Sequence, residues 1–115
     1  MKSPITTHIL DTASGRPAAN VPVRLDRRKS DGSWEKLGGG PTDADGRVTG
    51  LLPESPRPSA GVYRISFDTG AYFKALKLDG FYPYVEVVFE LTKPNEHHHV
   101  PLLLSPFGYS TYRGS

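Results

Sequence analysis

The sequence predicts an all-β domain, a sandwich of eight strands with one short helix. Twelve glycines and 11 prolines are spread over the whole chain and separate short apolar segments, which is the pattern of strands joined by turns. Within these segments apolar and polar residues alternate with the period of two that a half-buried strand shows. The length of 115 residues is that of one domain, residues 1–115.

Four strands are expected in the first half of the chain. Residues 5–11 alternate β-branched side chains between two faces. In the second segment Pro22 lies near the strand start, because proline cannot donate to a ladder. Asp31-Gly32 predicts a hairpin turn before the third segment, and residues 38–41 are expected to end it. Asp45-Gly46 opens the fourth. The expected strands cover residues 5–11, 21–26, 34–37, 47–52, 63–67, 85–91, 97–104 and 109–112.

The helix is expected after the fifth strand. Three prolines make residues 53–61 a loop, and the alternating strand at 63–67 follows it. Asp68 or Thr69 is expected to cap a helix. This helix passes through residues 71–76 and ends at Asp79-Gly80, where glycine can take a left-handed conformation.

The turn Lys93-Pro94-Asn95 predicts that residues 85–91 and 97–104 form a hairpin. In the returning strand His98 shares a face with the apolar residues Val100, Leu102 and Leu104, whereas His97 and His99 share the opposite face. A short strand at 109–112 completes the sandwich.

Charge and cysteine content exclude several function classes. The formal net charge is only +2, and the basic cluster Arg27-Arg28-Lys29 adjoins a turn, so nucleic acid is not an expected partner. The chain has no cysteine, which excludes a disulfide framework, a zinc–thiolate site and a cysteine nucleophile. It lacks an apolar run near the roughly 20 residues of a membrane span and lacks a signal-peptide stretch. We therefore expect a soluble, cytoplasmic protein without a membrane partner.

The four histidines are candidates for proton transfer near neutral pH. His8 stands alone, and His97, His98 and His99 are consecutive. Adjacent strand residues face opposite sides, so at most His97 and His99 share a side, and no nearby Asp or Cys completes a metal site. The spacing therefore argues against a metal. It leaves open whether these histidines act in catalysis or are polar residues of a half-exposed strand.

Two other segments allow both a structural and a functional interpretation. Arg47 follows the Asp45-Gly46 turn and is either a solvated surface arginine or a planar fork of donors for an oxygen-rich ligand. Residues 112–115 follow an apolar strand, and a chain end of this kind is usually disordered.

Three segments together identify a resemblance that covers nearly the full length. They are residues 7–12 with Gly15 and Pro17-Ala18, residues 42–47, and residues 97–106 with the ending Tyr112-Arg113-Gly114-Ser115. This set resembles the 5-hydroxyisourate hydrolases, the transthyretin-related family of urate breakdown. The final tetrapeptide is the most specific part, because it separates the hydrolases from transthyretin, a hormone carrier with the same fold.

The resemblance implies a transthyretin (prealbumin)-like sandwich that forms a homotetramer, a dimer of dimers, with substrate sites in a channel between paired dimers. The implied reaction adds water to a ring carbonyl of 5-hydroxyisourate and breaks the adjacent carbon–nitrogen bond, without a metal or another cofactor. The implied catalytic residues are His8, Arg47 and His99, and the implied substrate-binding residues are Ser110, Tyr112, Arg113, Gly114 and Ser115.

Chemistry favours one mechanism within this family but leaves the base unassigned. A neutral imidazole is the natural base for activating water, and either His8 or His99 could serve, with Arg47 stabilising the developing oxyanion. A serine nucleophile at Ser110 or Ser115 is the enzymatic alternative, yet the Gly-x-Ser-x-Gly elbow is absent. The non-enzymatic alternative is a transthyretin-like carrier of an aromatic ligand, which would not need two histidines and an arginine in its channel.

Overall fold

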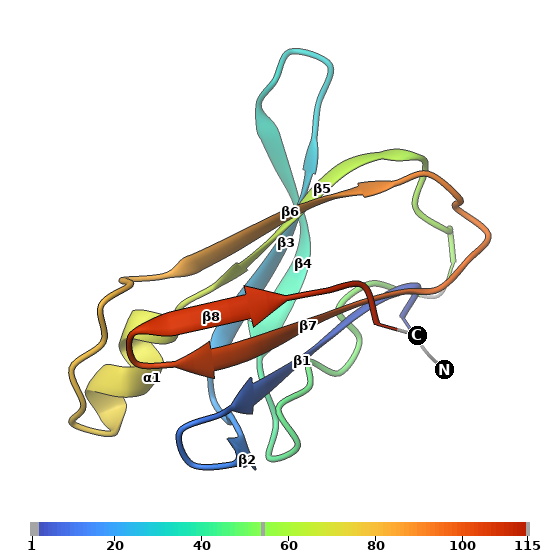
Figure 1. Ribbon diagram of the computed structural model, residues 1–115. Helices are drawn as coiled ribbons and strands as arrows, with labels where there is room; N and C mark the ends of the chain where they lie inside the picture. Colours follow the sequence, from blue (N-terminus) through green and yellow to red (C-terminus); the bar gives the residue numbers. More distant parts are fainter. Residues whose placement is uncertain (1–2, 54, 115) are drawn as a thin grey trace.

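Two four-stranded sheets face each other in the computed structural model, which describes residues 3–53 and 55–114 (Figure 1). One sheet has the order β2-β1-β7-β8 and the other β4-β3-β5-β6. Within the described residues the elements are β1 (Ile5–Asp11), β2 (Arg16–Pro17), β3 (Pro22–Arg28), β4 (Trp34–Pro41), β5 (Gly61–Phe67), α1 (Thr69–Ala75), β6 (Val85–Leu91), β7 (His98–Ser105) and β8 (Gly108–Thr111). The predicted eight-stranded sandwich with one short helix is confirmed.

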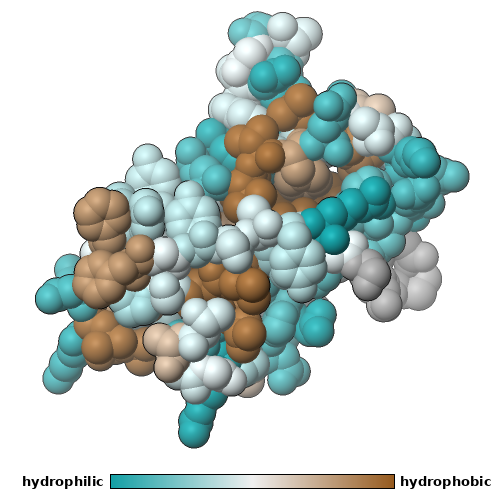
Figure 2. All heavy atoms as spheres, in the orientation of Figure 1, coloured by the Kyte–Doolittle hydropathy of each residue, from teal (hydrophilic) through white to brown (hydrophobic). Residues whose placement is uncertain are grey.

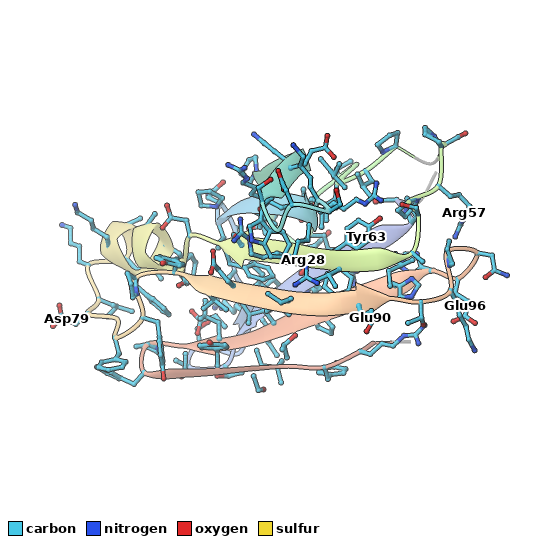
Figure 3. All side chains as sticks on the ribbon, turned by 90° about the horizontal axis from the view of Figure 1, so that it is seen from above. Arg28, Arg57, Tyr63, Asp79, Glu90 and Glu96 are labelled. Carbon is cyan, nitrogen blue, oxygen red and sulfur yellow. The ribbon has the colours of Figure 1, made fainter. Side chains whose placement is uncertain are left out.

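The core fills the space between the two sheets, which appear as two layers in the view from above (Figure 3). Alternate residues of each strand point into it, as the period of two predicts. Burial of these side chains supplies the main stabilising free energy. The fully buried side chains include Ile5 and Ile9 of β1, Tyr63, Ile65 and Phe67 of β5, and Leu102 and Leu104 of β7.

The predicted hairpin between residues 85–91 and 97–104 is wrong, although both strands exist. β6 pairs with β5, whereas β7 lies parallel to β1 in the opposite sheet. The turn around Pro94 therefore carries the chain from one sheet to the other. Alternation identifies the apolar face of each strand but not its pairing partner, and crossing lets both strands direct that face into one core. The predicted faces are right, because His98 is buried while His97 and His99 are more exposed.

Two short segments also differ from expectation. β4 continues to Pro41 through the three glycines that were expected to end it. A Cβ at Gly39 would lie 2.5 Å from the carbonyl oxygen of Val23, so glycine permits the close pairing of β4 with β3. Residues 47–52 form no strand and contribute only an isolated bridge between Arg47 and His8. The two-residue strand β2, which the sequence pattern does not reveal, pairs instead with the end of β1.

The helix begins as predicted and ends earlier. The Asp68 carboxylate caps it by accepting a hydrogen bond of 3.1 Å from the amide of Ala71. The helix ends at Ala75, and Lys77 rather than Gly80 takes the left-handed conformation, with φ of 59°. This helix is far too short to cross a membrane, and the described part of the chain has no other that is long and apolar enough.

Candidate active site

The site is built on the outer face of the β2-β1-β7-β8 sheet, where β1 and β7 run side by side (Figure 1). Their parallel register sets Thr6 opposite His99 and His8 opposite Pro101. Residues two apart on a strand share a face, so Thr6 and His8 project on the side away from the core. Both are half-buried, whereas their neighbour Thr7 is buried.

Arg47 reaches this face through a tight turn. The amide of Ile9 donates a hydrogen bond of 2.9 Å to the carbonyl of Gly46, and Arg47 forms a β-bridge with His8. Gly46 has φ of +77°, and a Cβ there would lie 2.5 Å from the carbonyl oxygen of Ile9 and 3.4 Å from His8 Cδ2. Only glycine combines this conformation with such a close approach. The turn thus fixes Arg47 beside His8.

The carboxy-terminal tail packs against His99 through Gly114. The Gly114 amide donates a hydrogen bond of 2.8 Å to the carbonyl of His99. A Cβ at Gly114 would lie only 2.5 Å from His99 Cδ2, so this position requires glycine. Tyr112 is 57% exposed. Ser115, the last predicted substrate-binding residue, lies outside the described residues.

Arginines hold the loop that precedes the three histidines. Arg113 Nη2 donates to the Glu96 carboxylate at 3.0 Å, which links the tail to this loop. Arg57 donates to the carbonyls of Pro94 and Glu96 at 2.9 and 3.3 Å. Figure 3 shows Arg57 and Glu96 at the same end of the molecule, opposite Asp79. The loop and the tail therefore support each other beside His99.

The Thr6 hydroxyl lies between two histidine rings. Its oxygen is 2.8 Å from His99 Nδ1 and 2.9 Å from His97 Nε2. The bond to Nδ1 fixes the orientation of the His99 ring and turns Nε2 away from Thr6. Sequence analysis did not single out Thr6. The only signal was its place on the same strand face as His8.

Burial lowers the pKa of His99 below its ordinary value, and the positive charges of Arg47, His97 and His8 lower this pKa further. The ring is therefore neutral near pH 7, the form that accepts a proton.

Two cavities meet at His99. One, of about 450 Å³, is lined by Thr6, Asp43, Arg47, His97 and His99 among others. The other, of about 240 Å³, is lined by His99, Tyr112, Arg113 and residues of β6. Ser110 lies on β8 opposite Leu103 and lines neither cavity. Of the predicted site residues, Arg47, Tyr112 and Arg113 each share a cavity with His99, and Gly114 packs on its ring. His8 is bridged to Arg47, but neither His8 nor Ser110 lines either cavity.

The same histidines are the candidates for metal ligands. Across residues 3–53 and 55–114, no three His, Asp or Glu side chains are grouped so that they could hold a metal ion. Independence of metal stays a prediction about the reaction.

Comparison with known proteins shows to which family the chain belongs. The sequence model of the HIUase/Transthyretin family matches residues 5–114. The chain belongs to this family. A 5-hydroxyisourate hydrolase of Salmonella dublin is 51% identical over 111 residues, covering 96% of this chain and 80% of that protein. A 5-hydroxyisourate hydrolase of Mus musculus is 51% identical over 115 residues, covering 98% and 96% of the two chains.

The fold of the HIUase/Transthyretin family is also evident from a solved structure. Sea bream transthyretin in complex with thyroxine superimposes with a TM-score of 0.90 at 38% identity, covering 97% of this chain and 95% of that one. The transthyretin-like fold is thereby confirmed. The comparisons thus include 5-hydroxyisourate hydrolases and a transthyretin that binds thyroxine, and the fold alone does not distinguish these functions.

Proposed function

We propose that this protein hydrolyses 5-hydroxyisourate to 2-oxo-4-hydroxy-4-carboxy-5-ureidoimidazoline, a step of urate degradation. The observation that carries the proposal is that a neutral His99 and Arg47 line one cavity, with His8 bridged to Arg47. The choice of substrate rests on the names of two relatives that are 51% identical, both called 5-hydroxyisourate hydrolase.

His99 is the general base in this proposal. Its lowered pKa keeps the imidazole neutral, and Thr6 at Nδ1 leaves Nε2 as the nitrogen that faces a bound water. Nε2 takes a proton from the water as its oxygen bonds to the ring carbonyl carbon. The carbon–nitrogen bond then breaks, and the proton passes to the departing nitrogen. Acid–base help of this kind contributes roughly 10²- to 10⁴-fold to the rate.

Arg47 stabilises the charge that develops on the attacked carbonyl oxygen. Its guanidinium presents donors in a planar fork that matches the oxygens of a flat, oxygen-rich ring. A fixed donor at such an oxyanion is worth roughly 3 to 4 kcal/mol. His8, bridged to Arg47 through the backbone, acts as the second acid–base group beside the same substrate.

The tail forms the substrate-binding wall in this proposal. Tyr112 and Arg113 line the cavity that shares His99, and Gly114 packs on the His99 ring. We propose that Ser115, which lies outside the described residues, also binds the substrate. Ser110 binds substrate only if a neighbouring subunit brings a second surface to β8, because within one chain it lies away from both cavities.

Assembly into a homotetramer, a dimer of dimers, is part of the proposal. β6 and β8 are edge strands of the two sheets, and residues of both line one cavity. Unpaired edges are sites of pairing with another chain. Apolar atoms are exposed on the face that carries these strands (Figure 2). The exposed side chains there include Val88 of β6, Tyr109 of β8 and the flanking Phe81 and Phe107, with exposed fractions from 43% to 70%.

The experiment is to mix the protein with freshly generated 5-hydroxyisourate and to follow the decay of its ultraviolet absorbance. A hydrolase accelerates the decay in proportion to protein concentration, and treatment with a chelator leaves the rate unchanged if no metal takes part. A carrier of aromatic ligands would bind thyroxine-like compounds in a titration and leave the decay at its spontaneous rate. That second result would reject the proposal.

A further inference from the structure

The hydroxyl of Thr6 in β1 contacts two histidines, His97 just before β7 and His99 within it. Thr6 Oγ1 lies 2.9 Å from His97 Nε2 and 2.8 Å from His99 Nδ1. Both distances are those of good hydrogen bonds. His97 is exposed and His99 is half-buried, so the three groups form a chain from solvent to the candidate base.

The number of protons shared by Thr6, His97 and His99 limits the protonation states that the three groups can adopt. A threonine hydroxyl has one proton to donate and two lone pairs to accept with. It cannot donate to both ring nitrogens, so at least one of them carries a hydrogen. When Nδ1 of neutral His99 carries it, Nε2 is bare and acts as a base, while the hydroxyl donates to His97. When His97 Nε2 carries it, the hydroxyl donates to Nδ1 and His99 Nε2 is protonated.

We propose that Thr6 is a positioning residue that joins His99 to His97 as a proton relay. The inference deepens the proposed function and rests on it, because it assigns a path for the proton that His99 takes from water. It also gives the exposed His97 a role as the group that holds the positive charge until the departing nitrogen takes its proton.

The relay step conserves every proton. After His99 Nε2 has accepted a proton from water, the ring is a cation with hydrogens on both nitrogens. The Nδ1 proton moves to Thr6 Oγ1 as the hydroxyl proton moves to His97 Nε2. His99 is then neutral with a proton on Nε2, and the positive charge lies on His97. When Nε2 gives its proton to the departing nitrogen, the two movements reverse, so Nδ1 regains its proton and both rings return to their starting forms.

Charges around His99 favour movement of the proton outward. Burial and the neighbouring cations lower the pKa of His99, so the cationic state of this ring is the less stable one, whereas His97 is exposed to water. Besides the relay itself, the titratable groups that line the two cavities or act on His99 are His8, Asp43, Arg47, Glu90, His98, Tyr112 and Arg113.

The kinetic test uses the full chain with Thr6→Val, Thr6→Ser, His97→Gln and the Thr6→Val, His97→Gln double variant. Valine keeps the β-branched shape and removes only the hydroxyl, and glutamine keeps a hydrogen-bonding side chain that does not titrate. We expect Thr6→Val and His97→Gln each to lower kcat about tenfold with little change in KM. Serine should restore kcat to within about twofold. The double variant should be no slower than Thr6→Val alone, because both changes break the same path.

A second measurement needs no substrate. Proton titration of the histidine rings by NMR should show two coupled steps for His97 and His99 in the wild-type chain. Thr6→Val should weaken this coupling and leave only the part that comes from repulsion between the two charged rings. Thr7→Val is the matched control, since Thr7 is the next residue of β1 and donates to the carbonyl of Val100 instead. It should lower the melting temperature and leave the coupling intact.

The outcomes separate the two proposals. Independent titration of His97 and His99 in the wild type, a Thr6→Ser variant as slow as Thr6→Val, or losses that multiply in the double variant would each overturn the relay. If the wild-type chain does not hydrolyse 5-hydroxyisourate, the proposed function fails, and the NMR coupling alone decides whether Thr6 joins the two rings.

Discussion

Arg47 is the residue whose shape, and not only its charge, matters in the proposed reaction. Arg47→Lys retains the positive charge and removes the planar fork. We expect kcat/KM for 5-hydroxyisourate to fall by about 10²-fold, in the range seen for loss of one oxyanion donor. Arg28→Lys, at the end of β3 in the exposed hairpin, is the matched control and should behave as wild type. An unchanged kcat/KM in Arg47→Lys would remove Arg47 from the site.

The pKa of His99 sets the acid limb of the pH profile. This pKa lies below the ordinary 6.5 because of burial and then of Arg47, so the base is neutral at pH 6.5 and activity falls only as the pH drops through the lower value. Arg47→Gln removes a positive charge and should raise the pKa, which moves the acid limb of kcat/KM to higher pH. A limb above 6.5 in the wild type, or a shift downward in the variant, would exclude His99 as the base.

The same shift predicts a change in stability with a definite sign. The unfolded chain binds a proton on His99 as the pH falls through 6.5, whereas the folded chain binds it only at lower pH. The contribution of His99 to the free energy of unfolding is therefore fully present above 6.5 and decreases as the pH falls toward the lowered pKa.

Individual residues differ in how far the sequence could predict them. His8, Arg47 and His99 follow from the motifs of the family, and the structure brings them together. Thr6 could not be found in this way, because its contacts depend on the register between β1 and β7, which lie more than 90 residues apart in the chain. Neither a propensity nor a local pattern encodes such a register.

The tail, residues 112–114, can form part of the site only if it keeps a fixed position beside His99. Gly114→Ala would place a methyl group 2.5 Å from His99 Cδ2, so the tail or the ring must move. We expect a loss of most activity with a small change in melting temperature, since few core groups are affected. Gly108→Ala is the matched control, because its Cβ would meet only Ser105 Oγ, at 3.7 Å. Equal activities in the two variants would argue that the tail is not part of the site.

The strands and the helix could be predicted where neighbouring residues in the sequence determine them. Alternation identified β1, β5, β6 and β7, and the Asp68 cap identified the start of α1. The partner of β7 was predicted wrongly, because either sheet could accept its apolar face and only the packing of the whole sandwich selects β1. The glycines of β4 wrongly predicted the end of that strand. The backbone of β3 lies so close to Gly39 that only glycine fits there within the strand.

At the scale of the whole molecule the proposal concerns assembly, because Val88 of the β6 edge lines the same cavity as the tail residues Tyr112 and Arg113. Sedimentation equilibrium should give four times the 12.6 kDa mass of the chain. Val88→Glu, on the β6 edge with 58% of its side chain exposed, should shift the mass toward monomer and lower activity together, while a Val88→Thr control should do neither. A fully active monomer would contradict the proposed tetramer and the role it gives to subunit contacts.

The central claim is that a neutral His99 activates water for the opening of 5-hydroxyisourate. Its most direct test compares the ultraviolet decay of freshly generated 5-hydroxyisourate in the presence of wild-type chain and of His99→Ala at equal concentration, with circular dichroism and melting temperature as the folding control. We predict rapid decay with the wild type and a rate at least about 10²-fold lower with the folded variant. Near-wild-type decay with His99→Ala would contradict the claim.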